Sequence, residues 1–208
     1  MKNIENQKSK DEDIEIRKIT FIGDCKVGKT SIVHQYLERE FEELYEPTIG
    51  ANYSGKLIFN HVKFIRLQIW DCGGKEVYKS LVDSYIYNSK VIVFVFDNFI
   101  SFNHSKESYN EILKKTQNKS KIIFVLNKID LEYNQHFIHE IEKWIERKKI
   151  LFLKITATKY ESVKVLFEEI LKDDPIQIKQ IPYSYKKDKI SFQNNKRIKH
   201  SYCNCFHF

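Results

Sequence analysis

Residues 23–30 of the chain read GDCKVGKT and match the pattern G-x-x-x-x-G-K-[ST]. The preceding residues, 16–22, have the composition of a β-strand, and residues 29–39 carry apolar side chains at helical spacing. In a strand–loop–helix context, the backbone N–H groups of such a loop and the helix N-terminus cradle phosphate oxygens. Lys29 is then predicted to neutralise β- and γ-phosphates, and Thr30 to ligate Mg²⁺. A glycine-rich turn that arose by chance is the alternative for this motif taken alone.

The rest of the chain alternates between strand and helix patterns. Three continuous apolar runs are rich in β-branched and aromatic residues, which is typical of strands buried on both faces of a parallel sheet: 91–96, 122–126 and 150–155. Segments with helical spacing separate these runs. Residues 52–59 and 62–70 alternate apolar and polar side chains around a short turn, which indicates a hairpin. We therefore predict an α/β fold, with a mostly parallel six-stranded sheet and helices on both faces.

The predicted domain covers residues 15–172, between an N-terminal extension of residues 1–14 and a flexible basic tail of residues 173–208. Beyond Pro175, which is expected to stop the last helix, the apolar periodicity fades. The tail has seven basic and three acidic residues, so it supplies +4 of the formal net charge of +7. Because the remaining residues carry only +3, a nucleic-acid-binding face on the domain is not indicated, and we expect no nucleic-acid partner. An RNA-binding tail is the alternative.

The composition excludes several classes of protein. The chain has 208 residues, of which 42% are hydrophobic and 30% charged, as in soluble globular proteins. The longest apolar run, residues 91–96, is too short to span a bilayer. The polar start, with Lys2 after Met1, matches neither a secretory signal peptide nor an N-myristoylation signal. The four cysteines favour a reducing compartment over a disulfide scaffold.

A second motif, Asn127-Lys128-Ile129-Asp130, follows the predicted strand of residues 122–126. The Asp130 carboxylate can accept hydrogen bonds from the N1–H and 2-amino groups of guanine, which adenine cannot offer. Asn127 can bond the base edge, and the stem of Lys128 can cover the ring. Taken alone, this tetrapeptide is more often an ordinary helix N-cap.

A third group of residues flanks the predicted hairpin on both sides. Asp71 is predicted to hold Mg²⁺ through a water, and the Gly74 N–H to contact the γ-phosphate. Thr48, directly after Pro47, is predicted to be a second hydroxyl ligand of Mg²⁺. Taken as an isolated residue, a threonine in this position is more often a plain loop threonine than a metal ligand.

Together, the motifs resemble the Ras superfamily of small GTPases, and within it the Rab branch, over residues 16–172. The similarity to Rab proteins is carried by residues 48–53 (TIGANY), 66–70 (RLQIW) and 85–87 (YIY), and by Cys203-Asn204-Cys205 in the tail. The resemblance implies a P-loop GTPase fold (G domain) that binds GTP or GDP with Mg²⁺, hydrolyses GTP and regulates vesicle-mediated membrane traffic. It also implies an exchange factor, a GTPase-activating protein and effectors that contact the switch regions.

The same resemblance assigns individual roles. Phe41 is expected to stack on the guanine edge, Tyr45 to close over the phosphates, and the Ala157 N–H to meet guanine O6. Thr48 marks switch I, and residues 75–81 form switch II. The expected catalytic residues are Lys75, Gly74 and Thr48, and the expected Mg²⁺ ligands are Thr30, Thr48 and Asp71. The expected nucleotide contacts are Gly23, Asp24, Cys25, Lys26, Val27, Gly28, Lys29, Thr30, Ser31, Phe41, Tyr45, Thr48, Asp71, Gly74, Asn127, Lys128, Asp130, Thr156, Ala157 and Thr158.

The chain departs from the family at one catalytic position. Where the family pattern is Asp-Thr-Ala-Gly-Gln-Glu, residues 71–76 read Asp-Cys-Gly-Gly-Lys-Glu. Lys75 thus replaces the glutamine that orients the attacking water, and an ammonium can donate but cannot accept a hydrogen bond. Cys25 also stands where larger side chains hinder the transition state. We therefore predict slow intrinsic hydrolysis, and the alternative is a hydrolysis-defective adaptor that binds GTP and recruits partners without cycling.

The end of the chain has the pattern of a lipid anchor. Cys205-Phe206-His207-Phe208 has C-a-a-X spacing with a geranylgeranyl-type last residue, and Cys203 precedes it. We therefore expect the prenylation machinery and a membrane to be partners of the tail, and the protein to lie on the cytosolic face of intracellular membranes. The alternative is a metal knuckle built from His200, Cys203, Cys205 and His207.

Overall fold

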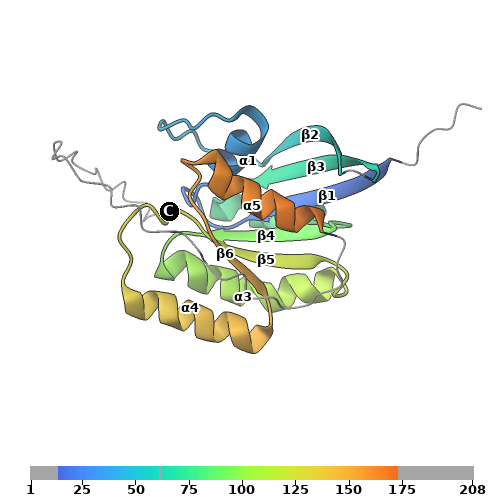
Figure 1. The fold of residues 1–208 in the computed structure, drawn as a ribbon. Helices are drawn as coiled ribbons and strands as arrows, with labels where there is room; N and C mark the ends of the chain where they lie inside the picture. Colours follow the sequence, from blue (N-terminus) through green and yellow to red (C-terminus); the bar gives the residue numbers. More distant parts are fainter. Residues whose placement is uncertain (1–13, 61, 173–208) are drawn as a thin grey trace, which may run out of the picture.

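The computed structural model describes residues 14–60 and 62–172 (Figure 1). The predicted tail, with its cysteines, and nearly all of the predicted N-terminal extension lie outside these residues. The elements, in chain order, are β1 (Glu15–Ile22), α1 (Lys29–Glu38), β2 (Ala51–Phe59), β3 (Phe64–Cys72), the 3₁₀ turn η1 (Glu76–Tyr78), α2 (Lys79–Ile86), β4 (Val91–Phe96), α3 (Phe99–Lys115), β5 (Lys121–Leu126), α4 (Gln135–Lys148), β6 (Leu151–Lys154) and α5 (Tyr160–Leu171).

The six strands form one sheet in the order β2-β3-β1-β4-β5-β6. Only the β2–β3 hairpin is antiparallel, and the other four pairs are parallel. The predicted fold class, an α/β sheet of this type with helices on both faces, is confirmed. All six residues of β4 are buried, as expected of an uninterrupted apolar strand in the centre of a sheet. Because parallel strands end at the same edge, the loops that follow β1, β3, β5 and β6 gather there.

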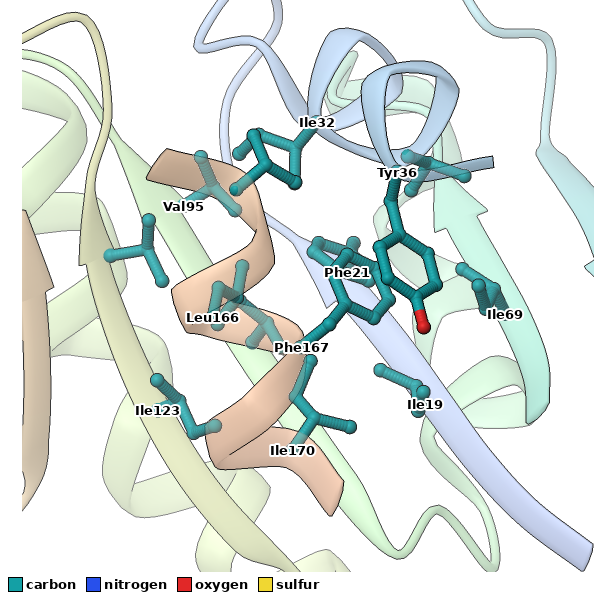
Figure 2. Close-up of a cluster of buried hydrophobic side chains, with 14 of the residues drawn as sticks. Ile19, Phe21, Ile32, Tyr36, Ile69, Val95, Ile123, Leu166, Phe167 and Ile170 are labelled. Carbon is teal, nitrogen blue, oxygen red and sulfur yellow. The ribbon is translucent and has the colours of Figure 1, made fainter. Parts of the chain in front are cut away.

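Helices α1 and α5 cover one face of the sheet (Figures 1 and 2). Tyr36 of α1 stacks on Phe167 of α5, with ring centroids 3.5 Å apart, and Phe167 also packs against Phe21 of β1. Full burial of one large apolar side chain contributes about 1.5–3 kcal/mol to the free energy of folding. This packing fixes α1 on the sheet, and therefore fixes the loop that precedes α1.

Helices α2, α3 and α4 pack on the opposite face. Aromatic rings join α3 and α4 to the sheet. Phe94 stacks on Phe124 with ring centroids 4.6 Å apart, and the Trp144 ring of α4 lies 5.2 Å from that of Phe124 and 5.5 Å from that of Tyr109 in α3. The start of α3 is fixed by a capping box between Asn98 and Ser101. The second layer is thus held by interlocking rings as well as by aliphatic contacts.

Several element boundaries differ from the prediction. Strand β3 begins at Phe64 and runs through Asp71 to Cys72, so residues 62–63 belong to the turn. Strand β6 is Leu151–Lys154, shorter than the predicted 150–155. Helix α5 ends at Leu171, and Pro175 lies outside the described residues. Among the described helices, none is both long and apolar enough to cross a bilayer.

Candidate nucleotide-binding site

The loop between β1 and α1 closes around a lysine. The backbone turns into α1 at Gly28, which has a φ of 95°, and a Cβ there would lie 2.2 Å from the Asn127 amide nitrogen, so both the backbone and the space require glycine. The Lys29 ammonium donates to the carbonyls of Gly23 (2.9 Å) and Asp24 (2.7 Å). Burial lowers the pKa of Lys29, although nearby Asp71 opposes that shift. The loop therefore holds a buried cation beside its backbone N–H groups.

Three oxygen-bearing side chains meet beside this lysine. The Thr30 hydroxyl donates to Asp71 Oδ2 at 2.5 Å and lies 3.0 Å from the Thr48 hydroxyl, which is itself 3.4 Å from the same carboxylate oxygen. Burial raises the pKa of Asp71, although its hydrogen bond from Thr30 and its proximity to Lys29 oppose the shift. Asp71 Oδ1 is buried and has no hydrogen-bond partner among the described residues.

This oxygen cluster fits Mg²⁺. A buried carboxylate oxygen without a partner calls for a cation or an ordered donor, and hydroxyl and carboxylate oxygens are the ligands that Mg²⁺ prefers. Within residues 14–60 and 62–172, no group of three or more His, Cys, Asp or Glu side chains could hold a metal, so this is a site of one carboxylate and two hydroxyls. The predicted ligands Thr30, Thr48 and Asp71 are thus brought together.

The loops after β5 and β6 form the other end of the site. Asn127 donates to the Val27 carbonyl (2.8 Å) and accepts from the Ala157 N–H (3.0 Å), which ties the β1–α1 loop to the loop after β6. The Thr156 hydroxyl donates to the Asp130 carboxylate. Both polar atoms of Asn127 are therefore used within the protein, and its contact with the base edge stays a prediction. The Ala157 N–H would have to be shared between Asn127 and guanine O6.

Lys128 is held rigidly across the same loops. Its ammonium lies 2.5 Å from the Asp97 carboxylate and donates to the Lys26 carbonyl at 2.6 Å. The Tyr133 hydroxyl donates to the Asn127 carbonyl at 2.6 Å, which supports the strand end from the other side. The aliphatic stem of Lys128 is thereby fixed at the wall of the site, as the predicted ring contact requires.

A cavity of about 700 Å³ joins the two ends. Its volume lies in the range of small-molecule sites. Of the residues predicted to contact nucleotide, all line the cavity except Gly23, Asp24, Val27 and Asp71. Phe41 and Tyr45 line it from the loop before β2, and the Lys26 ammonium lies 5.5 Å from the centre of the Tyr45 ring. The stacking and closing roles of these two aromatic residues stay predictions.

Lys75 does not line the nucleotide cavity. Its side chain is exposed and lines a separate cavity of about 380 Å³ between residues 73–83 and α3. Gly74 lines both cavities and packs so closely on the phosphate loop that a Cβ would lie 2.3 Å from the Cys25 nitrogen. The Asp24 carboxylate turns away from the nucleotide cavity and pairs with His104 of α3 at 2.7 Å. The predicted catalytic group is thus divided: Thr48 and Gly74 line the nucleotide cavity, and Lys75 does not.

The sequence analysis did not predict nine of the residues that line the nucleotide cavity: His34, Glu42, Glu43, Leu44, Glu46, Pro47, Ile49, Asn52 and Leu131. His34 could have been found, because it follows Thr30 by four positions in α1 and so lies on the same helix face. Asn52 and Leu131 carried no comparable signal, since their positions depend on how two loops fold over the sheet edge.

One comparison with known proteins bears on this site. The family model of the Ras family matches residues 18–175 of the chain. The matched stretch contains the phosphate loop, the oxygen cluster, Asp130 and the loop after β6.

Proposed function

The chain belongs to the Ras family, and from this membership we propose that it is a Rab-type guanine-nucleotide switch with slow intrinsic GTP hydrolysis. Members of the family bind guanine nucleotides, usually with Mg²⁺, and hydrolyse GTP. One observation carries the proposal: a single cavity has a buried lysine and an oxygen cluster at one end, and Asp130 at the other. These are the groups needed for a triphosphate, a divalent cation and a guanine base.

At the phosphate end, this chain supplies charge and orientation. Lys29 offers a buried ammonium beside the backbone N–H groups of residues 23–28, which suits β- and γ-phosphate oxygens. Thr30, Thr48 and Asp71 would hold Mg²⁺, which neutralises negative charge on those phosphates when bound. Because Thr48 comes from the loop before β2, its part in the cluster draws that loop towards the phosphates.

At the base end, Asp130 supplies selectivity. A carboxylate can accept two hydrogen bonds from guanine, and the bond from Thr156 restricts the rotation of that carboxylate. Adenine offers no such pair of donors. Each charge-assisted hydrogen bond contributes about 1.5–3 kcal/mol, so a preference for guanine of at least ~100-fold is expected.

The experiment on this function is nucleotide selectivity in the unmodified chain and in two variants. We expect GTP to bind at least ~100-fold more tightly than ATP, and Asp130→Asn to shift the preference towards xanthine nucleotides, because the amide donates to the carbonyl of xanthine. Glu132→Gln is the matched control: Glu132 is an exposed acid in the same loop that does not line the nucleotide cavity. Equal affinities for GTP and ATP in the unmodified chain would defeat the assignment.

The Rab branch is supported by an aromatic stack between the two switches. Tyr53 of β2 contacts Trp70 of β3 at 5.3 Å, and Trp70 stacks on Tyr85 of α2 at 5.4 Å. Each of the three lies in a different Rab-like stretch of the sequence. Tyr53 is half exposed, so the stack offers partners an apolar surface beside both switches. We propose that effectors which direct vesicle traffic contact it there.

The exposed position of Lys75 favours slow hydrolysis, and it is also the observation that favours the alternative of a non-cycling adaptor. Rab-type GTPase-activating proteins can supply the water-orienting glutamine in trans. Lys75 of the chain itself cannot take that role, because an ammonium does not accept a hydrogen bond from the attacking water. We therefore expect a Rab-type activator to restore multiple-turnover phosphate release, and an activator that relies on the substrate's own glutamine to have no effect. Failure of every Rab-type activator, with GTP binding intact, would favour the adaptor.

A further inference from the structure

The two edges of the sheet carry opposite charge. We define the basic edge as the segments where the parallel strands β4, β5 and β6 begin and α5 ends: residues 88–90, 114–121, 146–150 and 169–172. These segments contain nine basic and two acidic residues. The loops at the nucleotide edge (residues 23–28, 40–49, 73–76, 97–98, 127–134 and 155–159) contain nine acidic and four basic residues. The modest net charge of the domain therefore hides a strong separation of charge along it.

The dipoles of two helices account for part of the basic edge. Lys114, Lys115, Arg147 and Lys148 lie in the last turns of α3 and α4, where cations are favoured by the helix dipole. Lys115 also pairs with Asp83 at 2.6 Å. Cations in the last turn of a helix would be expected in any domain of this kind.

Three further lysines lie outside the last turns of α3 and α4. Lys90 and Lys119 lie outside the helices, and Lys149 is the C-cap residue of α4. All three are exposed, and none forms an ion pair with any residue that the structure describes. They come from three separate connections, yet they meet at one edge because parallel strands start there. Cations that gather without ion-pair partners among residues 14–60 and 62–172 indicate a negatively charged partner outside the domain.

We propose that the basic edge is the face with which this domain docks on an anionic lipid surface. The end of α5 is held at this edge, because the Ile170 carbonyl accepts from Arg17 at 3.1 Å and the Glu169 carbonyl accepts from Lys121 at 2.6 Å. Residues 173–208, which themselves carry seven basic and three acidic residues, therefore continue the chain from the basic edge. A polybasic surface from which the chain continues into a polybasic sequence suits anionic headgroups.

The composition of the edge favours lipid over nucleic acid. Single-stranded nucleic acid is bound by cations interleaved with aromatic side chains on which bases stack. The four segments of the basic edge contain no aromatic residue, and eight of their nine cations are lysines, which lack the planar fork that grips phosphate pairs. A membrane on this face would also repel the acidic nucleotide edge, so the switches would point away from the lipid and stay accessible to partners.

The test compares two triple variants of the full chain without lipid modification. Lys90→Glu/Lys119→Glu/Lys149→Glu reverses the charge of the three exposed lysines that have no ion pair among the described residues. Lys106→Glu/Lys143→Glu/Lys164→Glu makes the same change in net charge within α3, α4 and α5. On phosphatidylcholine vesicles with about 30 mol% phosphatidylserine, we expect the first variant to bind at least ~tenfold more weakly and the control to change less than ~twofold. Equal losses in both variants, or none, would overturn the proposal.

A second measurement uses the unmodified chain and does not depend on how a variant folds. Hydrogen–deuterium exchange should slow in residues 114–121 and 146–150 on the anionic vesicles, and stay unchanged in residues 40–49. Protection of residues 40–49 instead, or none within the domain, would contradict the proposed orientation. If the basic-edge variant lost affinity for single-stranded RNA but not for vesicles, the face would be a nucleic-acid surface. The proposal goes beyond the nucleotide switch. We expect GDP affinity to be unchanged in both variants, so a failure of membrane docking can be distinguished from a failure of nucleotide binding.

Discussion

At the scale of single residues, we propose that Lys75 limits the rate at which this protein hydrolyses GTP by itself. Phosphoryl transfer depends on positioning and electrostatics, and Lys75 neither lines the nucleotide cavity nor accepts a hydrogen bond from water. We expect Lys75→Gln to raise single-turnover GTP hydrolysis by at least ~tenfold, which corresponds to about 1.4 kcal/mol of barrier. Phosphate release from preloaded protein measures this rate.

The matched control for this experiment is Lys79→Gln, which changes another exposed lysine of the same region. Its hydrolysis rate should stay unchanged. Cys25 lines the nucleotide cavity and can crowd the γ-phosphate. Lys75→Gln should therefore also be measured together with Cys25→Gly, because two substitutions that act on the same phosphate are not expected to have additive effects on the rate. A rate that is unchanged or lowered in both backgrounds would refute the view that the missing glutamine limits catalysis.

The two described cysteines should differ sharply in reactivity. Cys25 is partly exposed in the nucleotide cavity, whereas Cys72 is buried, and burial raises the pKa of the Cys72 thiol to about 12. In a variant with Cys203→Ser and Cys205→Ser, maleimide should modify Cys25 and leave Cys72 untouched until the protein unfolds. Saturating GDP should slow the modification of Cys25 at least ~tenfold. Peptide mass spectrometry reads both sites, and rapid labelling of Cys72 in the folded protein would contradict the packing described here.

At the scale of elements, Gly73 joins the two switch loops. Its N–H donates to the Gly50 carbonyl at 2.7 Å, and a Cβ at Gly73 would lie 2.6 Å from the Thr48 carbonyl and 2.9 Å from the Tyr78 ring. Gly73→Ala should therefore push the loops apart, with a cost of about 1–3 kcal/mol in unfolding free energy. Denaturant unfolding measures that cost.

The control for this prediction is Gly55→Ala in β2, where a Cβ would come no closer than 3.6 Å to a neighbouring atom. That variant should be as stable as the unmodified protein, or slightly more stable. If Gly73→Ala were equally neutral, the close approach of the two switch loops at this glycine would be wrong.

Elements with strong local signals could be predicted from the sequence. Strand β4 was predicted with its observed bounds, because an uninterrupted run of apolar, mostly β-branched residues suits only a central strand. Helix α2 was not predicted as a helix, although Leu81, Val82, Tyr85 and Ile86 have helical spacing, because its eight residues give a short pattern directly after a loop and a 3₁₀ turn.

Within the site, motif residues were predictable and the bonds between motifs were not. Asp130 and Thr30 follow from local patterns in the sequence. The use of Asn127 as a brace between two loops, and the pairing of Asp24 with His104, depend on contacts between residues far apart in the chain. No local pattern of residue types specifies such contacts.

At the scale of the whole molecule, net charge concealed the distribution of charge. The sequence indicated that most of the positive charge belongs to the tail, and the net charge of only +3 on the remaining residues supports that interpretation. The fold, however, gathers lysines from three connections at one edge and acids from other loops at the opposite edge. This arrangement depends on the direction of the strands, which a sum over composition does not contain.

Membrane attachment through the tail and nucleotide binding by the domain should be separable properties of the molecule. Cys203 and Cys205 lie outside the described residues, and the nucleotide site is complete without them. Replacing both with Ser should move a tagged protein from membranes to cytosol and leave GDP affinity unchanged, since stable attachment needs a lipid anchor as well as basic residues. Cell fractionation provides the readout. Full retention on membranes would show that another part of the chain, or a partner, supplies the attachment.

The central claim is that guanine nucleotide sets the conformation of two loops, and hydrogen–deuterium exchange in the presence of Mg²⁺ tests it most directly. The full chain should be loaded with GDP or with a non-hydrolysable GTP analogue. Thr48 and Gly74 both line the nucleotide cavity, so the triphosphate should slow exchange at least ~fivefold in residues 41–49 and 75–81 and leave β4 and β5 unchanged. Identical exchange in both loops with the two nucleotides would contradict the account.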